Sequence, residues 1–248
     1  MFIDSHCHPY HAHDPLAVLS RARSCGVTDF VVPAYDHDSW TAVTHLDSEH
    51  ADVHPAFGLH PWVADQPLDL VELETLLRRP GVVAVGEIGL DFKLDTPAPS
   101  IQIPVFRKQL ALARDLDLPV ILHVRGASEE MLEILASDGP VPGVVHAFTR
   151  GPELARRFLD LGLYLGLGGA ITRPTARRPR RSALAVPLER IVLETDAPSI
   201  GLEGVPAGES EPCHVVQVAT ALAELRGVDV DEISRITTRN ARELFHLS

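Results

Sequence analysis

The amino-acid sequence predicts an α/β protein, a single (β/α)8 barrel of the TIM type that spans residues 1–248. Eight short apolar, β-branched runs alternate with segments of helical periodicity, which indicates parallel βαβ units, and eight strands suffice to close a barrel. A length of 248 residues is typical of one such barrel. Polar residues of metal-ligand type follow the apolar runs, at the strand ends where barrel enzymes keep their sites. A doubly wound open sheet shows the same alternation and remains the alternative fold.

The expected strands are short and lie at 2–4, 28–33, 53–58, 82–87, 119–123, 143–147, 163–168 and 190–195. The clearest helix is 105–116, where Phe106, Leu110 and Ala113 recur at helical spacing. Further helices are expected at 15–25, 67–78, 127–137, 152–161, 212–226 and 230–246. Breaker residues concentrate in 93–104, 172–181 and 201–212, and the prolines at 174 and 179 make 174–185 a poor helix.

Composition excludes several classes of protein. No apolar run reaches the roughly 18 residues of a membrane span. The start MFIDSHCHP lacks the pattern of a signal peptide, and three scattered cysteines favour a reducing cytoplasm. The net charge of −12 disfavours a protein that holds nucleic acid through a global positive field. It leaves room for an enzyme that meets phosphates locally through metal ions and a few arginines.

Two histidines follow the first strand. Side chains at i and i+2 of a strand point the same way, so His6 and His8 can bind one ion together while Cys7 points to the other side. His11 and His13 repeat the spacing beyond Pro9, in an expected loop, and we interpret them as solvated.

Other candidate ligands follow later strands of the predicted barrel, and each one alone is as typical of a satisfied buried side chain. They are His60, Glu87, His123, His146 and Asp196. Because the carboxyl ends of parallel strands share one face of a barrel, we expect them to converge in one cleft with His6 and His8. Asp91 is expected to fix the loop after Glu87, and Glu194 to support a ligand.

The ligand types indicate the metal chemistry. Mixed nitrogen and oxygen ligands suit Zn²⁺, Mn²⁺ or Mg²⁺. His6, His8, Glu87, His123, His146 and Asp196 are too many ligands for one catalytic Zn²⁺. They suit two divalent ions about 4 Å apart, with Glu87 as the best candidate for the bridge.

Several strings then match a known family, in order along the whole chain. They are FIDSHCH (2–8), GLHP (58–61), VGEIGLD (85–91), a Gln-x3-Phe-x2-Gln-Leu pattern (102–110), LPVILH (118–123), GVVHAF (143–148) and LETDAP (193–198). With them the chain resembles the TatD family of metal-dependent hydrolases, the TatD-type deoxyribonucleases, within the amidohydrolase-like barrels.

The resemblance implies roles for these residues. His6, His8, Glu87 and Asp196 would hold one ion, and Glu87, His123 and His146 the second. His60 would contact the scissile phosphate or orient a substrate oxygen. Characterised members of the family are nucleases, often 3′ exonucleases that need divalent metal. The sequence departs from the family pattern at Phe92, Gly126 and Ser210, where many members have Tyr, Asp and Asn. None of these is a proposed ligand, so the departures bear on substrate choice.

The expected function is hydrolysis of phosphodiester bonds in DNA, as a 3′-5′ exodeoxyribonuclease acting on single strands or 3′ ends. Two divalent cations would lower the pKa of a bridging water toward about 7 and polarise the phosphoryl oxygen. Glu87 would bridge the ions, Asp196 would accept a proton from the attacking water, and His60 would stabilise the equatorial oxygens.

Arginines are the expected helpers in bringing a negative substrate to an acidic protein. Arg125 lies beside His123, and Arg173 and Arg177 belong to an arginine-rich segment after the seventh strand. Solvated surface charge is the alternative interpretation of that segment.

Two other functions remain open. A two-metal esterase or amidohydrolase, such as a D-aminoacyl-tRNA deacylase, uses the same activated water. A barrel without activity that binds a partner or stores metal is disfavoured because all six candidate ligands are present. Nothing in the sequence demands an obligate protein partner or more than a monomer. No G-x-G-x-x-G string follows the first strand, which argues against a Rossmann-type nucleotide binder.

Overall fold

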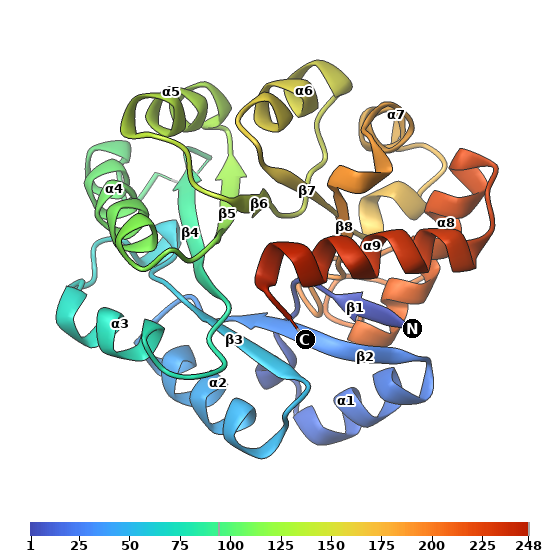
Figure 1. Ribbon diagram of the computed structural model, residues 1–248, viewed down its shortest axis with the longest axis horizontal. Coiled ribbons are helices and arrows are strands. Elements are labelled where there is room, and N and C mark those ends of the chain that lie inside the picture. The colour runs from blue at the N-terminus through green and yellow to red at the C-terminus, as the bar shows by residue number, and fades with distance from the viewer. Residues whose placement is uncertain (94, 248) are drawn as a thin grey trace.

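A computed structural model describes residues 1–93 and 95–247 of the chain, so position 94 of the breaker-rich segment 93–104 lies outside it. Eight parallel strands pair in sequence order and curl into a nearly closed barrel surrounded by helices (Figure 1). The strands are β1 (Phe2–Asp4), β2 (Val27–Pro33), β3 (Val53–Phe57), β4 (Ala84–Asp91), β5 (Val120–Arg125), β6 (Gly143–Val145), β7 (Tyr164–Leu167) and β8 (Ile191–Leu193). The predicted (β/α)8 barrel is confirmed, and the open sheet is wrong.

Backbone hydrogen bonds join the first and last strands just beyond their carboxyl ends. The Ser5 N–H donates to the Leu193 carbonyl at 2.9 Å, and the Asp196 N–H donates to the His6 carbonyl at 2.8 Å. The seam of the barrel therefore ties two candidate ligands, 190 positions apart in sequence, directly to each other.

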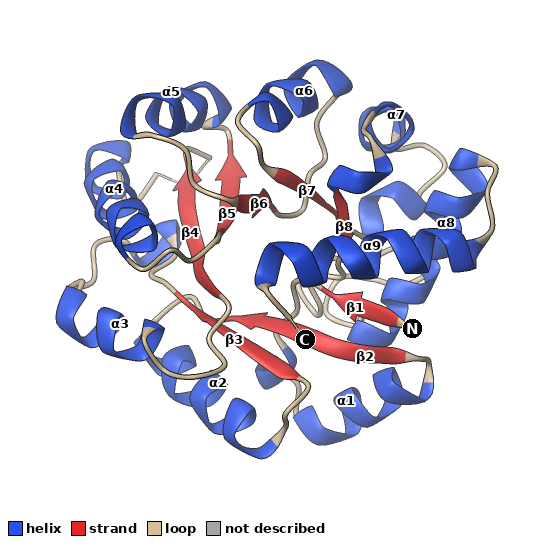
Figure 2. Cartoon of the chain, in the orientation of Figure 1, coloured by secondary structure: helices blue, strands red, loops and turns tan. Residues whose placement is uncertain are grey.

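Helices form the outer layer of the barrel (Figure 2). They are α1 (Pro15–Ser24), α2 (His37–Glu49), α3 (Leu70–Leu77), α4 (Pro99–Asp115), α5 (Ser128–Asp138), α6 (Pro152–Asp160), α7 (Arg177–Ala185), α8 (Val215–Arg226) and α9 (Val230–Phe245). No helix in the described part of the chain combines the length and apolar character needed to span a membrane.

Three helices differ from the prediction. Helix α2 was not predicted, and a capping box starts it: the Ser39 N–H donates to the Asp36 carboxylate at 2.8 Å, and the Asp36 N–H donates to the Ser39 hydroxyl at 2.9 Å. Helix α7 forms although the prolines at 174 and 179 predict that 174–185 is a poor helix. Pro179 falls in the first turn of α7, where backbone N–H groups have no partner within the helix. Helix α4 begins at Pro99, six residues before the expected start at 105.

The interior of the barrel is filled by one apolar side chain from nearly every strand. The layer comprises Ile3, Val31, Ala56, Ala84, Ile121, Val144 and Val192, with Tyr164 packed against it. Ala241, Leu244 and Phe245 of α9 belong to the same cluster, so this helix closes the amino-terminal end of the barrel (Figure 1). A second, larger core fills the space between the strands and the surrounding helices.

Gly89 of β4 has no room for a side chain. Its φ is +146°, and an added Cβ would lie 2.0 Å from the His123 carbonyl oxygen. We expect Gly89→Ala to lower the free energy of unfolding by about 3 kcal/mol or more, measured by urea denaturation.

Gly204→Ala is the matched control for this prediction. Gly204 also has a positive φ, +78°, but no heavy atom lies within 4 Å of its added Cβ. The control should cost only about 1 kcal/mol, which is typical of a left-handed non-glycine residue. Equal losses for the two variants would show that the close approach of β4 to β5 is unimportant.

Candidate metal centre

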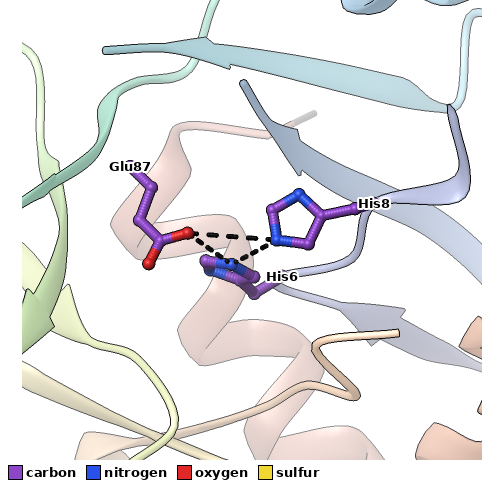
Figure 3. A group of neighbouring side chains, drawn as sticks. All are labelled: His6, His8 and Glu87. Carbon is purple, nitrogen blue, oxygen red and sulfur yellow. Dashed lines mark hydrogen bonds and ion pairs between the residues drawn. The ribbon is translucent and has the colours of Figure 1, made fainter. Parts of the chain in front are cut away.

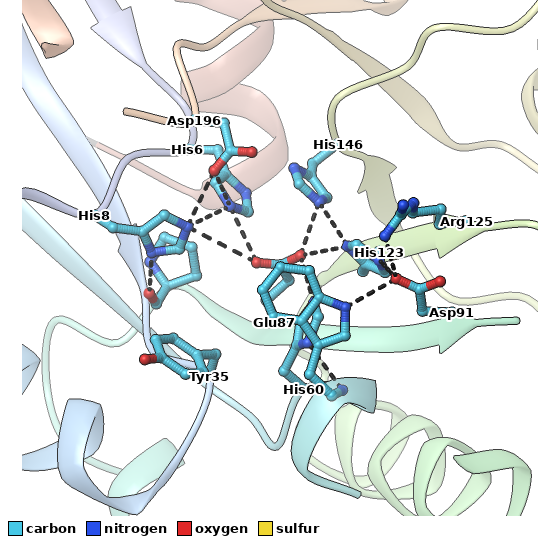
Figure 4. Close-up of polar contacts among 12 residues, drawn as sticks. His6, His8, Tyr35, His60, Glu87, Asp91, His123, Arg125, His146 and Asp196 are labelled. Atoms are coloured by element: carbon cyan, nitrogen blue, oxygen red, sulfur yellow. Dashed lines mark hydrogen bonds and ion pairs between the residues drawn. The ribbon is translucent and has the colours of Figure 1, made fainter. Parts of the chain in front are cut away.

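The candidate ligands meet at the carboxyl ends of the strands (Figure 4). Most of them line a cavity of about 650 Å³, and all but the partly buried His123 are buried. The residues that the structure brings together are His6, His8, His60, Glu87, His123, His146 and Asp196. Their convergence follows from the barrel, because each lies on or just after a different strand, except the His6–His8 pair.

Glu87 lies at the centre of the site. Strand β4 was expected to end there but continues to Asp91, and its pairing with β5 shifts register between Val85 and Ile88. Such an irregularity redirects a side chain in mid-strand. The Oε1 atom of Glu87 lies 3.0 Å from His123 Nδ1 and 2.8 Å from His146 Nε2.

The other carboxylate oxygen of Glu87 faces a different group of donors (Figure 3). Its Oε2 atom lies 3.3 Å from His6 Nε2 and 3.9 Å from His8 Nε2. Asp196 completes this group, with Oδ1 at 3.3 Å from His8 Nε2 and 3.8 Å from His6 Nε2. One carboxylate thus touches two sets of nitrogen and oxygen atoms.

Hydrogen bonds on the far side of two imidazoles determine which nitrogen faces the site. His8 Nδ1 lies 3.1 Å from the Pro33 carbonyl, and His123 Nε2 lies 3.2 Å from Asp91 Oδ2. A carbonyl and a carboxylate can only accept, so these nitrogens carry the protons and donate. The lone pairs of His8 Nε2 and His123 Nδ1 then point into the site, as metal ligation requires.

These donor atoms fit a bound cation. His6 Nε2 and His8 Nε2 lie only 3.1 Å apart, and His146 Nε2 lies 3.4 Å from His123 Nδ1. Two ring nitrogens this close need a positive charge between them, which either a shared proton or a bound cation supplies. Three groups of His and Glu side chains in the described residues have ligand atoms within 4.8 Å of one another: His6–His8–Glu87, His60–Glu87–His123 and His6–His146–Glu194.

His60 differs from His8 and His123 in which ring nitrogen carries the proton. Its Nδ1 accepts the backbone N–H of Trp62 at 3.1 Å, and burial lowers its pKa, so the neutral ring carries its proton on Nε2. That Nε2–H points at Glu87 Oε1, 3.2 Å away. His60 therefore offers the site a hydrogen-bond donor, whereas its neighbours offer lone pairs.

Charges in the site keep the central carboxylate ionised, and histidines surround it. Burial alone would raise the pKa of Glu87, but the surrounding histidines hold it well below its usual range. Burial lowers the pKa of His6 to about 4, which keeps its lone pair free. Burial opposes protonation of His146 as well, yet Glu87 raises its pKa to about 10. A cation bound to Glu87 would take the place of such protons.

Asp91 has further contacts that the sequence does not predict. It lies in β4 rather than in a loop, and it is fully buried. It does accept the Lys93 N–H at 2.9 Å, as a loop-fixing residue would, but its Oδ2 also accepts from His123 and from Trp62 Nε1. The sequence carries no signal for these contacts with His123 and Trp62. They depend on the pairing of β4 with β5, which places Asp91 beside Arg125.

The two glutamines of the 102–110 pattern fasten α4 to the strand ends. Gln102 exchanges two hydrogen bonds with the Asp91 backbone, at 2.8 and 2.9 Å. Gln109 does the same with the Leu59 backbone, at 2.7 and 3.0 Å. The first pair anchors the opening turns of α4, which explains why the helix starts ahead of Pro104.

Glu194 is buried next to His146 and is not part of the cavity lining. Its carboxylate accepts the Ala147 N–H, and Oε1 lies 3.8 Å from His146 Nδ1. Its donor atoms lie within 4.8 Å of those of His6 and His146. Burial raises the pKa of Glu194 to about 8. This position matches the expected supporting role.

The arginines divide into two sets. Arg125 lines the cavity, and so does Arg150, which the sequence reasoning missed because it lies in the loop after β6. Arg173 and Arg177 are not part of that lining: Arg173 donates to the Gly201 carbonyl at 2.9 Å, and Arg177 begins α7. His11 and His13 are both exposed, as expected, although His11 reaches the edge of the cavity.

The barrel and the cluster of histidines and carboxylates around its cavity suit a metal-dependent hydrolase, which is also the description of curated relatives of this chain. Residues 3–246 match the family model described as TatD related DNase, and the chain belongs to this family.

Two relatives and one solved structure illustrate the similarity. The uncharacterised metal-dependent hydrolase YjjV of Escherichia coli K12 is 39% identical, over 99% of this chain and 98% of its own. The protein from Edwardsiella piscicida named 3'-5' ssDNA/RNA exonuclease TatD is 35% identical, over 93% of each chain. The crystal structure of YjjV superposes with a TM-score of 0.94 at 36% identity, covering 100% of this chain and 98% of that one.

Proposed function

We propose that the protein removes nucleotides from the 3′ end of single-stranded DNA by hydrolysing phosphodiester bonds, with two divalent metal ions such as Mg²⁺, Mn²⁺ or Zn²⁺. The observation that carries this proposal is the Glu87 carboxylate, whose two oxygens face two separate sets of ligand atoms. The exonuclease name of the Edwardsiella piscicida relative supports DNA as a substrate.

The proposed ligands fall into two sets that share Glu87. His6, His8 and Asp196 would hold one ion with Oε2, and His123 and His146 the other with Oε1. Divalent cations held there would supply Lewis acidity that activates water and offsets the charge of a phosphate in the transition state.

Asp196 is the proposed proton acceptor. Burial would raise the pKa of its carboxyl group, but the His8 hydrogen bond and nearby His6 lower it, so Asp196 is ionised at neutral pH. It borders the cavity, where a carboxylate can take a proton from the attacking water. His60 would donate its Nε2 proton to a phosphate oxygen, because that proton already points into the site.

Arg125 is the arginine best placed to contact the substrate phosphate. Its side chain is 54% exposed on the cavity wall. Arg173 and Arg177 lie beyond the cavity lining, so they would meet only a nucleic-acid strand that continues past the site.

The test is to incubate the protein with 5′-labelled and 3′-labelled single-stranded DNA in Mg²⁺ or Mn²⁺, with and without EDTA. We expect a ladder of shortening products from the 5′ label and immediate release of mononucleotide from the 3′ label, both abolished by EDTA. Glu87→Gln protein purified in parallel controls for contaminating nucleases. Turnover of a D-aminoacyl-tRNA without cleavage of DNA would replace the proposal with the deacylase alternative.

Asp91→Asn is expected to weaken metal binding by about 10- to 100-fold, because loss of the charge behind His123 makes its imidazole a poorer ligand. The Asp91 carboxylate acts on this imidazole through the 3.2 Å contact between Asp91 Oδ2 and His123 Nε2. Calorimetric titration with Mn²⁺ measures the effect. Asp115→Asn, the same change at an exposed position of α4, should leave the affinity unaltered. An unchanged affinity in both variants would refute a positioning role for Asp91.

A further inference from the structure

Trp62 is a large aromatic side chain left in solvent beside the candidate metal centre. It follows β3 on a short 3₁₀ turn, Pro61–Val63, and is 50% exposed. Other exposed large apolar side chains in the described residues belong to the N-terminus or to outer helices, whereas Trp62 lines the cavity. Exposure of this apolar ring surface to water costs free energy, and a planar ligand that covers the ring would remove that cost.

Trp62 is held in place by one hydrogen bond from its indole and one from its backbone. Its Nε1–H donates to Asp91 Oδ2 at 2.9 Å, and its backbone N–H donates to His60 Nδ1 at 3.1 Å. The ring centroid lies 4.7 Å from that of His60 and 5.9 Å from that of His123, edge to face in both cases. Because the only polar atom of the indole is already bonded, a ligand meets its π surface.

A positive charge lies beside this surface. Arg125 Nη1 lies 3.4 Å from Asp91 Oδ2, the same oxygen that accepts the Trp62 indole N–H. An aromatic plane, a guanidinium and the candidate ligand His123 are therefore gathered around one carboxylate. The complementary ligand has a planar base joined to a phosphate.

We propose that Trp62 is the stacking surface for the base of the 3′-terminal nucleotide, an assignment that rests on the proposed exonuclease activity. Stacking uses the π face that every base has, so the subsite would accept all four bases without reading sequence. Fixing the indole through Asp91 and His60 would place the base at a set distance from the scissile phosphate.

Tryptophan fluorescence offers a direct test that involves no turnover. The chain has two tryptophans, and Trp40 is 2% exposed with its Nε1–H bonded to the Gly58 carbonyl. In Mg²⁺, dAMP should quench Trp62 and bind at least about tenfold more tightly than 2-deoxyribose 5-phosphate, which lacks a base. Trp62→Ala should remove both the quench and the tenfold preference, and Trp62→Phe should keep part of the preference.

A kinetic measurement separates this subsite from the nuclease proposal. Oligonucleotides ending in a 3′ nucleotide should have a KM about tenfold lower than those ending in a 3′ abasic residue, and Trp62→Ala should bring this ratio close to one. DNA cleavage with equal ratios in the two proteins, or dAMP binding without a quench, would overturn the stacking role. A quench and base preference without any DNA cleavage would refute the exonuclease and keep the base subsite.

Discussion

Glu87→Gln is expected to abolish one of the two proposed metal sites and to lower the proposed DNA hydrolysis by about 1000-fold or more, equivalent to about 4 kcal/mol of lost transition-state stabilisation. An amide has one oxygen and one NH₂ group. Whichever way the substituted side chain points, one donor set meets an NH₂ group that cannot ligate a cation. Either set can be the one that loses its oxygen, because Oε1 of Glu87 contacts His123 and His146 while Oε2 contacts His6.

Calorimetric titration with Mn²⁺, beside an activity assay, measures this effect. The wild-type stoichiometry should be two ions per chain, and the Glu87→Gln stoichiometry should be one or none. Glu72→Gln makes the same chemical change at an exposed position of α3 and should behave as wild type. Full occupancy of two ions in Glu87→Gln would show that this carboxylate does not bridge them.

Asp196→Asn is expected to lower kcat by about 100- to 10,000-fold, because the amide cannot accept the proton of the attacking water. The backbone of Asp196 is left-handed, with φ of +51°, a conformation that asparagine adopts more easily than alanine does. Asparagine therefore tests the chemistry of the carboxylate without adding backbone strain.

Asp117→Asn is the matched control for Asp196→Asn. Asp117 is exposed and has nearly the same φ, 54°, so the control carries the same backbone demand at a distance from the site. Circular dichroism and thermal melts should give both variants a native fold. Near-native kcat in Asp196→Asn would rule out proton acceptance by this residue.

Most of the fold and the central residues of the site could be predicted from the sequence because both depend on periodic features. Strand ends in a parallel barrel share one face, so placing His60, His123 and His146 at the ends of apolar runs was enough to bring them together. The sequence pattern also singled out Glu87, and its two carboxylate oxygens face different histidines in the structure.

Features that depend on irregular backbone or on tertiary contacts escaped prediction. The continuation of β4 to Asp91 requires a shift in its register with β5, which the pattern of apolar residues does not predict. Helix α4 starts early because Gln102 is bonded to another element, and α7 tolerates Pro179 because of its position in the first turn. Trp62 and Arg150 lie in connecting segments, where periodicity says nothing about which way a side chain points.

Helix α9 closes one end of the barrel. Its Leu244 and Phe245 side chains pack against the interior layer of the barrel, so the cavity is blind-ended. In the proposed exonuclease reaction a nucleic-acid strand would not thread through this packed interior, and each released nucleotide would leave on the face where the strand enters. Such a closed end would suit the trimming of a free terminus, and it would make retreat of the shortened strand or escape of the product a step between successive cuts.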